Sequence, residues 1–192
     1  MQPSLTGAKS ELRQKMRARL AATSGAHRTV EAAQICARMK GSDVWQSAGT
    51  VLLFVPLSDE PDVWPLLEFA LHEQKLVALP FYEAQNDVYT ARQVTDLVAD
   101  LRTGKFGVRE PKPDCSEVAL NRLDLVLVPG VAFDARCRRL GRGRGFYDRL
   151  LAVASGRKCG VAFDEQIVAE VPAGPQDIHL NCILTPTRWI ET

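Results

Sequence analysis

The sequence lacks paired cysteines, long apolar runs and a signal-peptide core. Its five cysteines are widely spaced with no C-x-x-C pair, so neither a redox motif nor a zinc site is indicated. No apolar stretch approaches the roughly 20 residues that span a bilayer, and the N-terminal segment is polar. These absences argue against a secreted or membrane protein, so we expect a cytoplasmic localisation with reduced thiols.

The chain also has little net charge, +1 at pH 7, and so lacks the basic field that drives binding to nucleic acid. Basic residues gather locally instead: six arginines lie between Arg136 and Arg149, where the one acidic residue is Asp148. The length of 192 residues suits one domain, and no repeat or linker interrupts it. We expect a single domain over residues 1–192 and a monomer, with a site at the arginine cluster.

Apolar periodicity alternates between helix and strand along the chain. Helices are predicted over residues 10–22, 26–39 and 61–74, the last with Pro61 in its first turn. The other predicted elements are buried strands over 50–55, 75–79, 123–128, 158–162 and 179–185, an edge strand over 87–94, and a short helix or turn over 95–102. Uninterrupted apolar strands between helices indicate an α/β fold, with a mostly parallel sheet and helices on both faces.

The most informative segment, residues 123–151, reads as a buried strand, a loop and a helix. The apolar run ends at Pro129-Gly130, the loop closes in glycines interleaved with arginines, and a helical pattern follows. Glycines let backbone N–H groups approach an anion, a helix N-terminus offers unpaired donors, and guanidinium groups bind oxygens in pairs. Alone, the segment is compatible with a nucleotide-phosphate site, an RNA contact or a solvated basic turn. It matches neither the P-loop nor the dinucleotide motif.

A carboxylate, Glu60, follows the strand predicted over residues 50–55. In open α/β sheets, ligands lie beyond the carboxyl ends of the strands. The glycine-arginine loop follows the strand over 123–128, so both features lie at the same edge of the sheet if these strands are parallel. We expect them to form one site.

The segment from Phe133 to Arg149, reading FDARCRRLGRGRGFYDR, resembles the signature of the 5-formyltetrahydrofolate cyclo-ligase family, also called 5,10-methenyltetrahydrofolate synthetase. That family usually has PG-x-x-FD, a short gap and RLGRGxGYYD. Four further matches follow the family's order: Lys9 with Arg13, Asp59-Glu60, the turn over residues 106–111, and the block over 160–177. The likeness therefore extends over nearly the whole chain.

The resemblance implies an enzyme that uses ATP and Mg²⁺ to cyclise 5-formyltetrahydrofolate to 5,10-methenyltetrahydrofolate, with release of ADP and phosphate. In the family, the γ-phosphoryl group of ATP passes to the formyl oxygen, and N10 of the folate then attacks the activated carbon. The implied partners are ATP and the folate, with no nucleic acid and no membrane. The protein must align the reactants and neutralise the developing charge.

Carried over residue by residue, the resemblance implies three sets of contacts. The ATP contacts are Lys9, Arg13, Arg139, Leu140, Gly141, Arg142, Gly143, Arg144, Gly145, Phe146 and Tyr147. The folate contacts are Val55, Glu60, Phe106, Arg142, Gly143, Arg144, Gly145 and Phe146, with Glu60 at the pterin and Phe106 stacking on the folate. The magnesium ligands are Asp148 and Asp177, and Arg142 is the catalytic group at the transferring phosphoryl.

Plainer roles remain open for several of these residues. Lys9 and Arg13 also fit a solvated helix face, Asp148 a helix cap or a charge that compensates the helix dipole, and Asp177 an isolated surface carboxylate. The family's first tyrosine is replaced by Phe146, and its Glu-x-Asp reads Pro-Gln-Asp here, which leaves a single carboxylate in that block.

Two other functions compete with the enzyme. A non-catalytic relative would not need the retained charged residues of the motifs, and an RNA-binding module would require more basic and aromatic residues along a sheet face. The histidines add no catalytic pattern. His27 and His72 lie on predicted helices without a partner pattern, so we expect surface or packing roles for these two. His179 is near Asp177 but lacks metal-ligand spacing.

Overall fold

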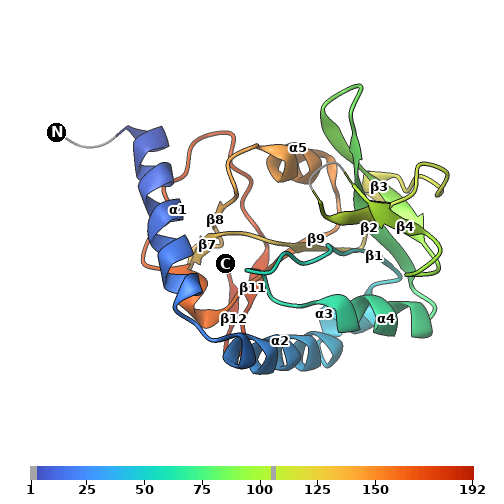
Figure 1. Cartoon of the computed structure of the whole chain (residues 1–192), viewed down its shortest axis with the longest axis horizontal. Helices are drawn as coiled ribbons and strands as arrows, with labels where there is room; N and C mark the ends of the chain where they lie inside the picture. The colour runs from blue at the N-terminus through green and yellow to red at the C-terminus, as the bar shows by residue number, and fades with distance from the viewer. Residues whose placement is uncertain (1–3, 105–106) are drawn as a thin grey trace.

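A seven-stranded sheet lies at the centre of the protein (Figure 1). The computed structural model describes residues 4–104 and 107–192. The strands of the sheet are β1 (Thr50–Leu52), β2 (Leu76–Glu83), β3 (Val88–Val94), β6 (Leu125–Val128), β9 (Arg157–Val161), β11 (Cys182–Leu184) and β12 (Trp189–Glu191). In space they follow the order β12-β11-β9-β6-β1-β2-β3. The inner strands are parallel, and the edge strands β3 and β12 are antiparallel to their neighbours.

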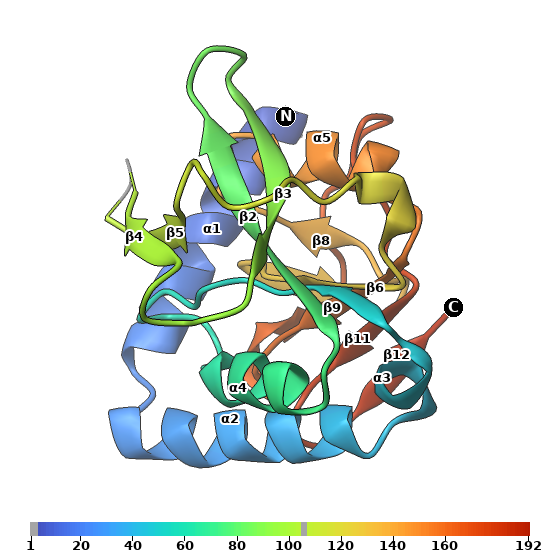
Figure 2. The same cartoon turned by 90° about the vertical axis from the view of Figure 1, so that its right-hand side faces the viewer.

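Helices cover both faces of this sheet, as Figures 1 and 2 show. One face carries α2 (Gly25–Lys40), α3 (Asp43–Ser47) and α4 (Trp64–His72), and the other carries α5 (Phe146–Val153). Strand β6 contributes Leu125 and Leu127 to the first apolar core, and Val126 and Val128 to the second. A strand that is buried on both faces needs an uninterrupted apolar run, which is the pattern seen in its sequence.

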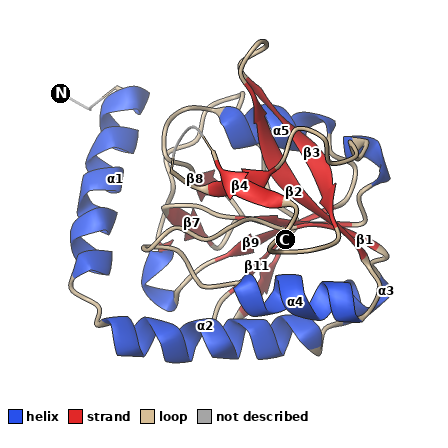
Figure 3. Cartoon of the chain, turned by 45° about the vertical axis from the view of Figure 1, so that its right-hand side comes forward, coloured by secondary structure: helices blue, strands red, loops and turns tan. Residues whose placement is uncertain are grey.

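Helix α1 (Leu5–Ala21) packs on a small second sheet beside the main one (Figure 3). That sheet has the order β10-β7-β8 and comprises β7 (Ala132–Asp134), β8 (Arg139–Leu140) and β10 (Ile167–Val168). Met16 of α1 is buried against Val131 and Leu140. This contact brings the helix next to the glycine-arginine loop. The remaining elements are the hairpin β4 (Leu101–Thr103) and β5 (Arg109–Pro111), and the 3-10 helices η1 (Leu120–Arg122) and η2 (Asp164–Gln166).

The predicted mostly parallel α/β sheet is confirmed, but some predicted ends were wrong. The strand predicted over residues 75–79 continues as β2 through Pro80. Proline is tolerated there because β1 ends at Leu52, the partner of Ala78, so its missing N–H faces no strand on that side. Helix α4 begins at Trp64, with Pro65 rather than Pro61 in its first turn.

Several short elements were not predicted. The loop expected after Pro129 contains the β7–β8 hairpin, and neither α3 nor β12 was expected. Residues 95–102 form turns and the start of β4, without a helix. All of these elements have five residues or fewer, which is too few to display an apolar period.

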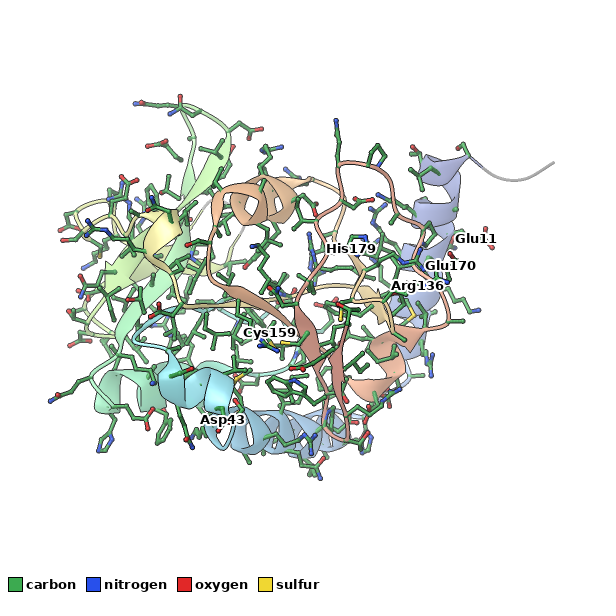
Figure 4. The ribbon with its side chains drawn as sticks, turned by 180° about the vertical axis from the view of Figure 1, so that it is seen from behind. Glu11, Asp43, Arg136, Cys159, Glu170 and His179 are labelled. Carbon is green, nitrogen blue, oxygen red and sulfur yellow. The ribbon has the colours of Figure 1, made fainter. Side chains whose placement is uncertain are left out.

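The labelled side chains in Figure 4 illustrate the difference between the interior and the surface. Cys159 lies among the packed side chains of the core, and Arg136 and Glu170 lie at the periphery. All five cysteines are free, and four of them are buried. Within the part of the chain that the structure describes, no helix has the length and apolarity that crossing a membrane would require.

Candidate active site

A cavity of about 560 Å³ opens at the carboxyl ends of the parallel strands. Val55 and Glu60, which follow β1, line it together with Gly130, which follows β6. Strands β1 and β6 are parallel neighbours, so the expected meeting of these two features at one edge is confirmed. The volume lies within the range of about 300–1,000 Å³ that is usual for small-molecule sites.

The cavity brings together the residues that the sequence singled out. Those that line it are Lys9, Arg13, Val55, Glu60, Arg139, Leu140, Gly141, Arg142, Gly143, Arg144, Gly145, Phe146, Tyr147, Asp148 and Asp177. Phe106, expected to stack on the folate, lies outside the described residues. Because α1 supplies two members from one end of the chain, the convergence depends on the tertiary fold.

The glycine-arginine loop takes a shape that requires glycine. Gly143 has φ 101° and Gly145 has φ 67°, both in the left-handed region that side chains disfavour. Gly145 is the N-cap of α5, and no side chain caps that helix terminus. The first backbone N–H groups of α5 are therefore available to an anion at the cavity.

Helix α1 is joined to this loop by its basic residues. Arg13 donates from Nε to the carbonyl oxygen of Gly141 at 2.9 Å. Lys9, one turn earlier, donates to both carboxylate oxygens of Asp177 at 2.7 and 2.6 Å. Both side chains therefore belong to the site, and the alternative of a solvated helix face is wrong.

Asp134 of the Phe133-Asp134 motif holds the segment that leads into the glycine-arginine loop. Asp134 is fully buried and accepts hydrogen bonds from the backbone N–H groups of Arg136, Arg138 and Val171 and from the Arg138 guanidinium. These bonds close the turn between β7 and β8. Since β8 leads directly into the glycine-arginine loop, Asp134 fixes where that loop begins. Its role is structural, and it does not line the cavity.

Replacing this buried carboxylate should destabilise the protein. We expect Asp134→Asn to lower the free energy of unfolding by about 2–3 kcal/mol, since an amide cannot accept all of these bonds. Thermal denaturation should show a melting temperature lower by about 5–10 °C. Glu170→Gln is the matched control because Glu170 binds the same Arg138 from a side chain that is 70% exposed. Its effect should be below about 0.5 kcal/mol; equal effects would contradict the assigned role.

Arg142 joins the glycine-arginine loop to the segment that follows β1. Its guanidinium donates to Oε1 of Glu60 at 3.0 and 3.2 Å and to Oδ1 of Asp59 at 2.5 Å. Burial raises the pKa of Glu60, although the Leu57 N–H and Arg142 oppose that rise. The sequence showed no basic neighbour for Glu60, and the structure supplies one from 82 residues away.

The two proposed magnesium ligands are each held by a cation. Asp148 accepts from Arg139 at 2.8 Å and makes no helix-capping bond, so the capping role is wrong. It does lie in the first turn of α5, where a carboxylate compensates the helix dipole. Asp177 binds Lys9 and the N–H of Gly174, so it is not an isolated surface carboxylate. Burial would raise the pKa of Asp177, but its bonds to Gly174 and Lys9 outweigh burial and lower it.

One wall of the cavity is aromatic, and the sequence did not reveal it. Tyr89 of β3 meets Phe146 edge to face, with ring centroids 5.2 Å apart, and Tyr82 meets the same ring at 5.5 Å. Burial raises the pKa values of Tyr89 and Tyr147. The alternating pattern of the edge strand was the available signal, since it placed Tyr89 and Ala91 on one face.

Comparison with known proteins identifies the family of the chain. Residues 5–186 match the sequence model of the 5-formyltetrahydrofolate cyclo-ligase family. The chain belongs to this family. The resemblance to this family that was seen in the sequence is confirmed. The match includes both α1 and the C-terminal block that carries Asp177.

Individual members of the cyclo-ligase family are similar to this chain in sequence, and one solved structure is similar to it in fold. The 5-formyltetrahydrofolate cyclo-ligase of Mycolicibacterium smegmatis is 36% identical over 157 residues, 75% of this chain and 77% of the relative. That of Escherichia coli K12 is 35% identical over 151 residues, with 75% and 81% covered. The NMR structure of Aquifex aeolicus 5,10-methenyltetrahydrofolate synthetase has a TM-score of 0.87 at 32% identity, covering 95% of this chain and 92% of that one.

Proposed function

We propose that this protein converts 5-formyltetrahydrofolate and ATP into 5,10-methenyltetrahydrofolate, ADP and phosphate. The observation that carries the proposal is the contact of Arg142 with Glu60 inside one cavity. The first residue belongs to the proposed phosphate loop and the second to the proposed folate site. Relatives in the family are named for this substrate and this product.

The phosphates of ATP would lie between α1 and the N-terminus of α5. Lys9 and Arg13 approach from one side, and the loop supplies Arg142 with Arg144. Gly143 and Gly145 allow the backbone to come close to phosphate oxygens without a side chain in the way. This is a cationic, donor-rich end of the cavity, which suits a polyanion.

Mg²⁺ fits the donors at the same end. It prefers oxygen ligands and uses one or two carboxylates together with phosphate oxygens. Asp148 and Asp177 offer such carboxylates, and each now binds a cation of the site. If they hold the ion, Arg139 and Lys9 become free to bind the phosphates. When bound, the ion would neutralise phosphate charge.

The pterin of the folate would lie against Glu60 and the aromatic wall. Glu60 is 9% exposed and turns its carboxylate into the cavity, where pterin N–H groups could donate to it. Val55 and Tyr89 line the same side. Arg142 now binds the Glu60 carboxylate, so pterin binding would leave the guanidinium held by Asp59 alone. With one partner fewer, the guanidinium could turn toward the phosphates.

Apart from one proton transfer, the reaction forms two bonds and breaks two. The formyl oxygen attacks the γ-phosphorus, and the bond between that phosphorus and ADP breaks. N10 then bonds to the formyl carbon and gives up its proton to solvent, and the carbon–oxygen bond breaks as phosphate leaves. Arg142 is placed to bind the oxygens of the transferring phosphoryl group in pairs, because a guanidinium offers two parallel donors.

An oxygen label tests this route. The formyl group of 5-formyltetrahydrofolate is labelled with a heavy oxygen isotope, and the released phosphate is analysed by mass spectrometry. We expect one labelled oxygen in each phosphate, because the formyl oxygen leaves attached to phosphorus. Unlabelled phosphate would contradict phosphoryl transfer to the formyl oxygen, because the phosphate would then come from attack by water.

The carboxylate of Asp148 provides a test of the metal site. Asp148→Asn still accepts a hydrogen bond from Arg139 but loses the charge that Mg²⁺ requires. We expect slower turnover and a higher requirement for Mg²⁺, measured by titrating the metal at fixed ATP, with a nearly unchanged melting temperature. Asp87→Asn, at a side chain that is 69% exposed, is the control. Normal magnesium dependence with a large drop in melting temperature would show a purely structural role.

A further inference from the structure

We propose that His27, Glu31 and Glu165 form a second metal site, for a first-row divalent transition ion such as Zn²⁺. One ligand atom from each residue lies within 4.8 Å of the other two. None of the three lines the cavity described above. The proposal does not depend on the proposed function, because it concerns a different surface of the protein.

The spacing of the three residues suits a chelate. His27 and Glu31 lie on α2 one turn apart, and Glu165 comes from η2. The Nε2 atom of His27 is 3.6 Å from Oε2 of Glu31 and 3.9 Å from Oε1 of Glu165. Ligands at about 2.0–2.2 Å from zinc in a tetrahedral site are separated by about 3.3–3.6 Å. Small side-chain movements would therefore bring the three ligand atoms to the distances that a bound zinc ion requires.

Burial supplies a second, independent reason. Glu31 is only 7% exposed, and its Oε2 has no hydrogen-bond partner among the described residues. Oε2 of Glu165 is buried without a partner as well. Burial and the nearby charge of Glu165 raise the pKa of Glu31. Unsatisfied buried carboxylate oxygens are costly, and a cation held between them would remove that cost.

The ligand chemistry selects the ion. An imidazole nitrogen with two carboxylate oxygens favours zinc or a neighbouring transition ion over Mg²⁺, which prefers oxygen alone. The His27 side chain is 56% exposed, so an ion can enter from solvent. Water would complete the coordination. The site is thus distinct in chemistry from Asp148 and Asp177.

A bound ion would tie α2 to the segment behind the cavity. Glu165 precedes Gln166, which is fully buried and donates from Nε2 to the carbonyl oxygen of Gly130 at 2.8 Å. Gly130 lines the cavity. The metal would therefore link α2 to the segment that holds Gly130 at the end of β6. We expect greater thermal stability as a consequence.

Zinc binding can be measured directly. The full chain is freed of metal with a chelator and titrated with Zn²⁺ by calorimetry, without ATP or folate. We expect one equivalent of tight binding and a melting temperature raised by about 5 °C or more at saturating zinc. His27→Gln and Glu165→Gln should each weaken binding at least tenfold and abolish the shift.

Matched controls distinguish this site from other side chains that could bind zinc. His72→Gln, on α4, removes an imidazole elsewhere and should leave zinc binding unchanged. Cobalt(II) bound in place of zinc should lack the charge-transfer absorption of thiolate ligands, which excludes the five cysteines. Absence of binding, or equal binding by wild type and both site variants, would overturn the proposal. Circular dichroism confirms that the variants are folded.

Discussion

Replacing Arg142 by alanine should lower kcat by about 10²-fold or more, since a phosphoryl-binding arginine acts mainly in the transition state. The structure places this arginine in the glycine-arginine loop, in contact with Glu60 inside the cavity. Arg142→Lys keeps the charge but loses the paired donors, so it should recover only part of the loss. Steady-state kinetics with both substrates varied provides the measurement.

Arg136→Ala is the matched control for this prediction. Arg136 lies in the same arginine-rich segment, but its side chain is exposed and does not line the cavity. It should retain normal kcat and KM. An unchanged kcat in Arg142→Ala, with weaker ATP binding alone, would show that Arg142 is an ordinary ground-state contact.

Glu60→Gln should weaken binding of 5-formyltetrahydrofolate by about 1–3 kcal/mol, the usual scale for a buried hydrogen bond to a charged group. The amide retains one acceptor but presents an N–H group to the pterin donors. Binding of ATP, measured by calorimetry without folate, should hardly change, because Asp59 still holds Arg142.

Asp59→Asn separates the two neighbouring carboxylates. Both bind Arg142, but the Asp59 side chain is 36% exposed and that of Glu60 is 6% exposed. The Asp59 variant should keep most of its affinity for folate. If ATP binding collapses in Glu60→Gln and folate binding survives, Glu60 belongs to the nucleotide half of the site.

The edge of the sheet where the site lies could be predicted from the sequence. The apolar run of β6 signalled a strand buried on both faces, and the carboxyl ends of parallel strands then had to converge. The glycines marked the loop that lines the cavity, whereas the left-handed backbone of Gly143 and Gly145 is a finding of the structure.

Two ion pairs of the site could not be predicted, because each joins residues that are distant in sequence. Lys9 and Asp177 are 168 residues apart, and Arg142 and Glu60 are 82 apart. The role of Asp134 was also hidden, because its partners are mostly backbone N–H groups of a hairpin too short to show a period. Residues 1–192 acting as one domain, and as a monomer, stay predictions.

The central claim, that one cavity joins ATP and folate for cyclisation, is tested most directly by product formation. The purified protein is mixed with Mg-ATP and 5-formyltetrahydrofolate at mildly acidic pH, and the absorbance of the methenyl product is followed. We predict a rise that depends on ATP, on Mg²⁺ and on the folate together, and that Arg142→Ala nearly abolishes. No rise above a heat-inactivated control would contradict the account.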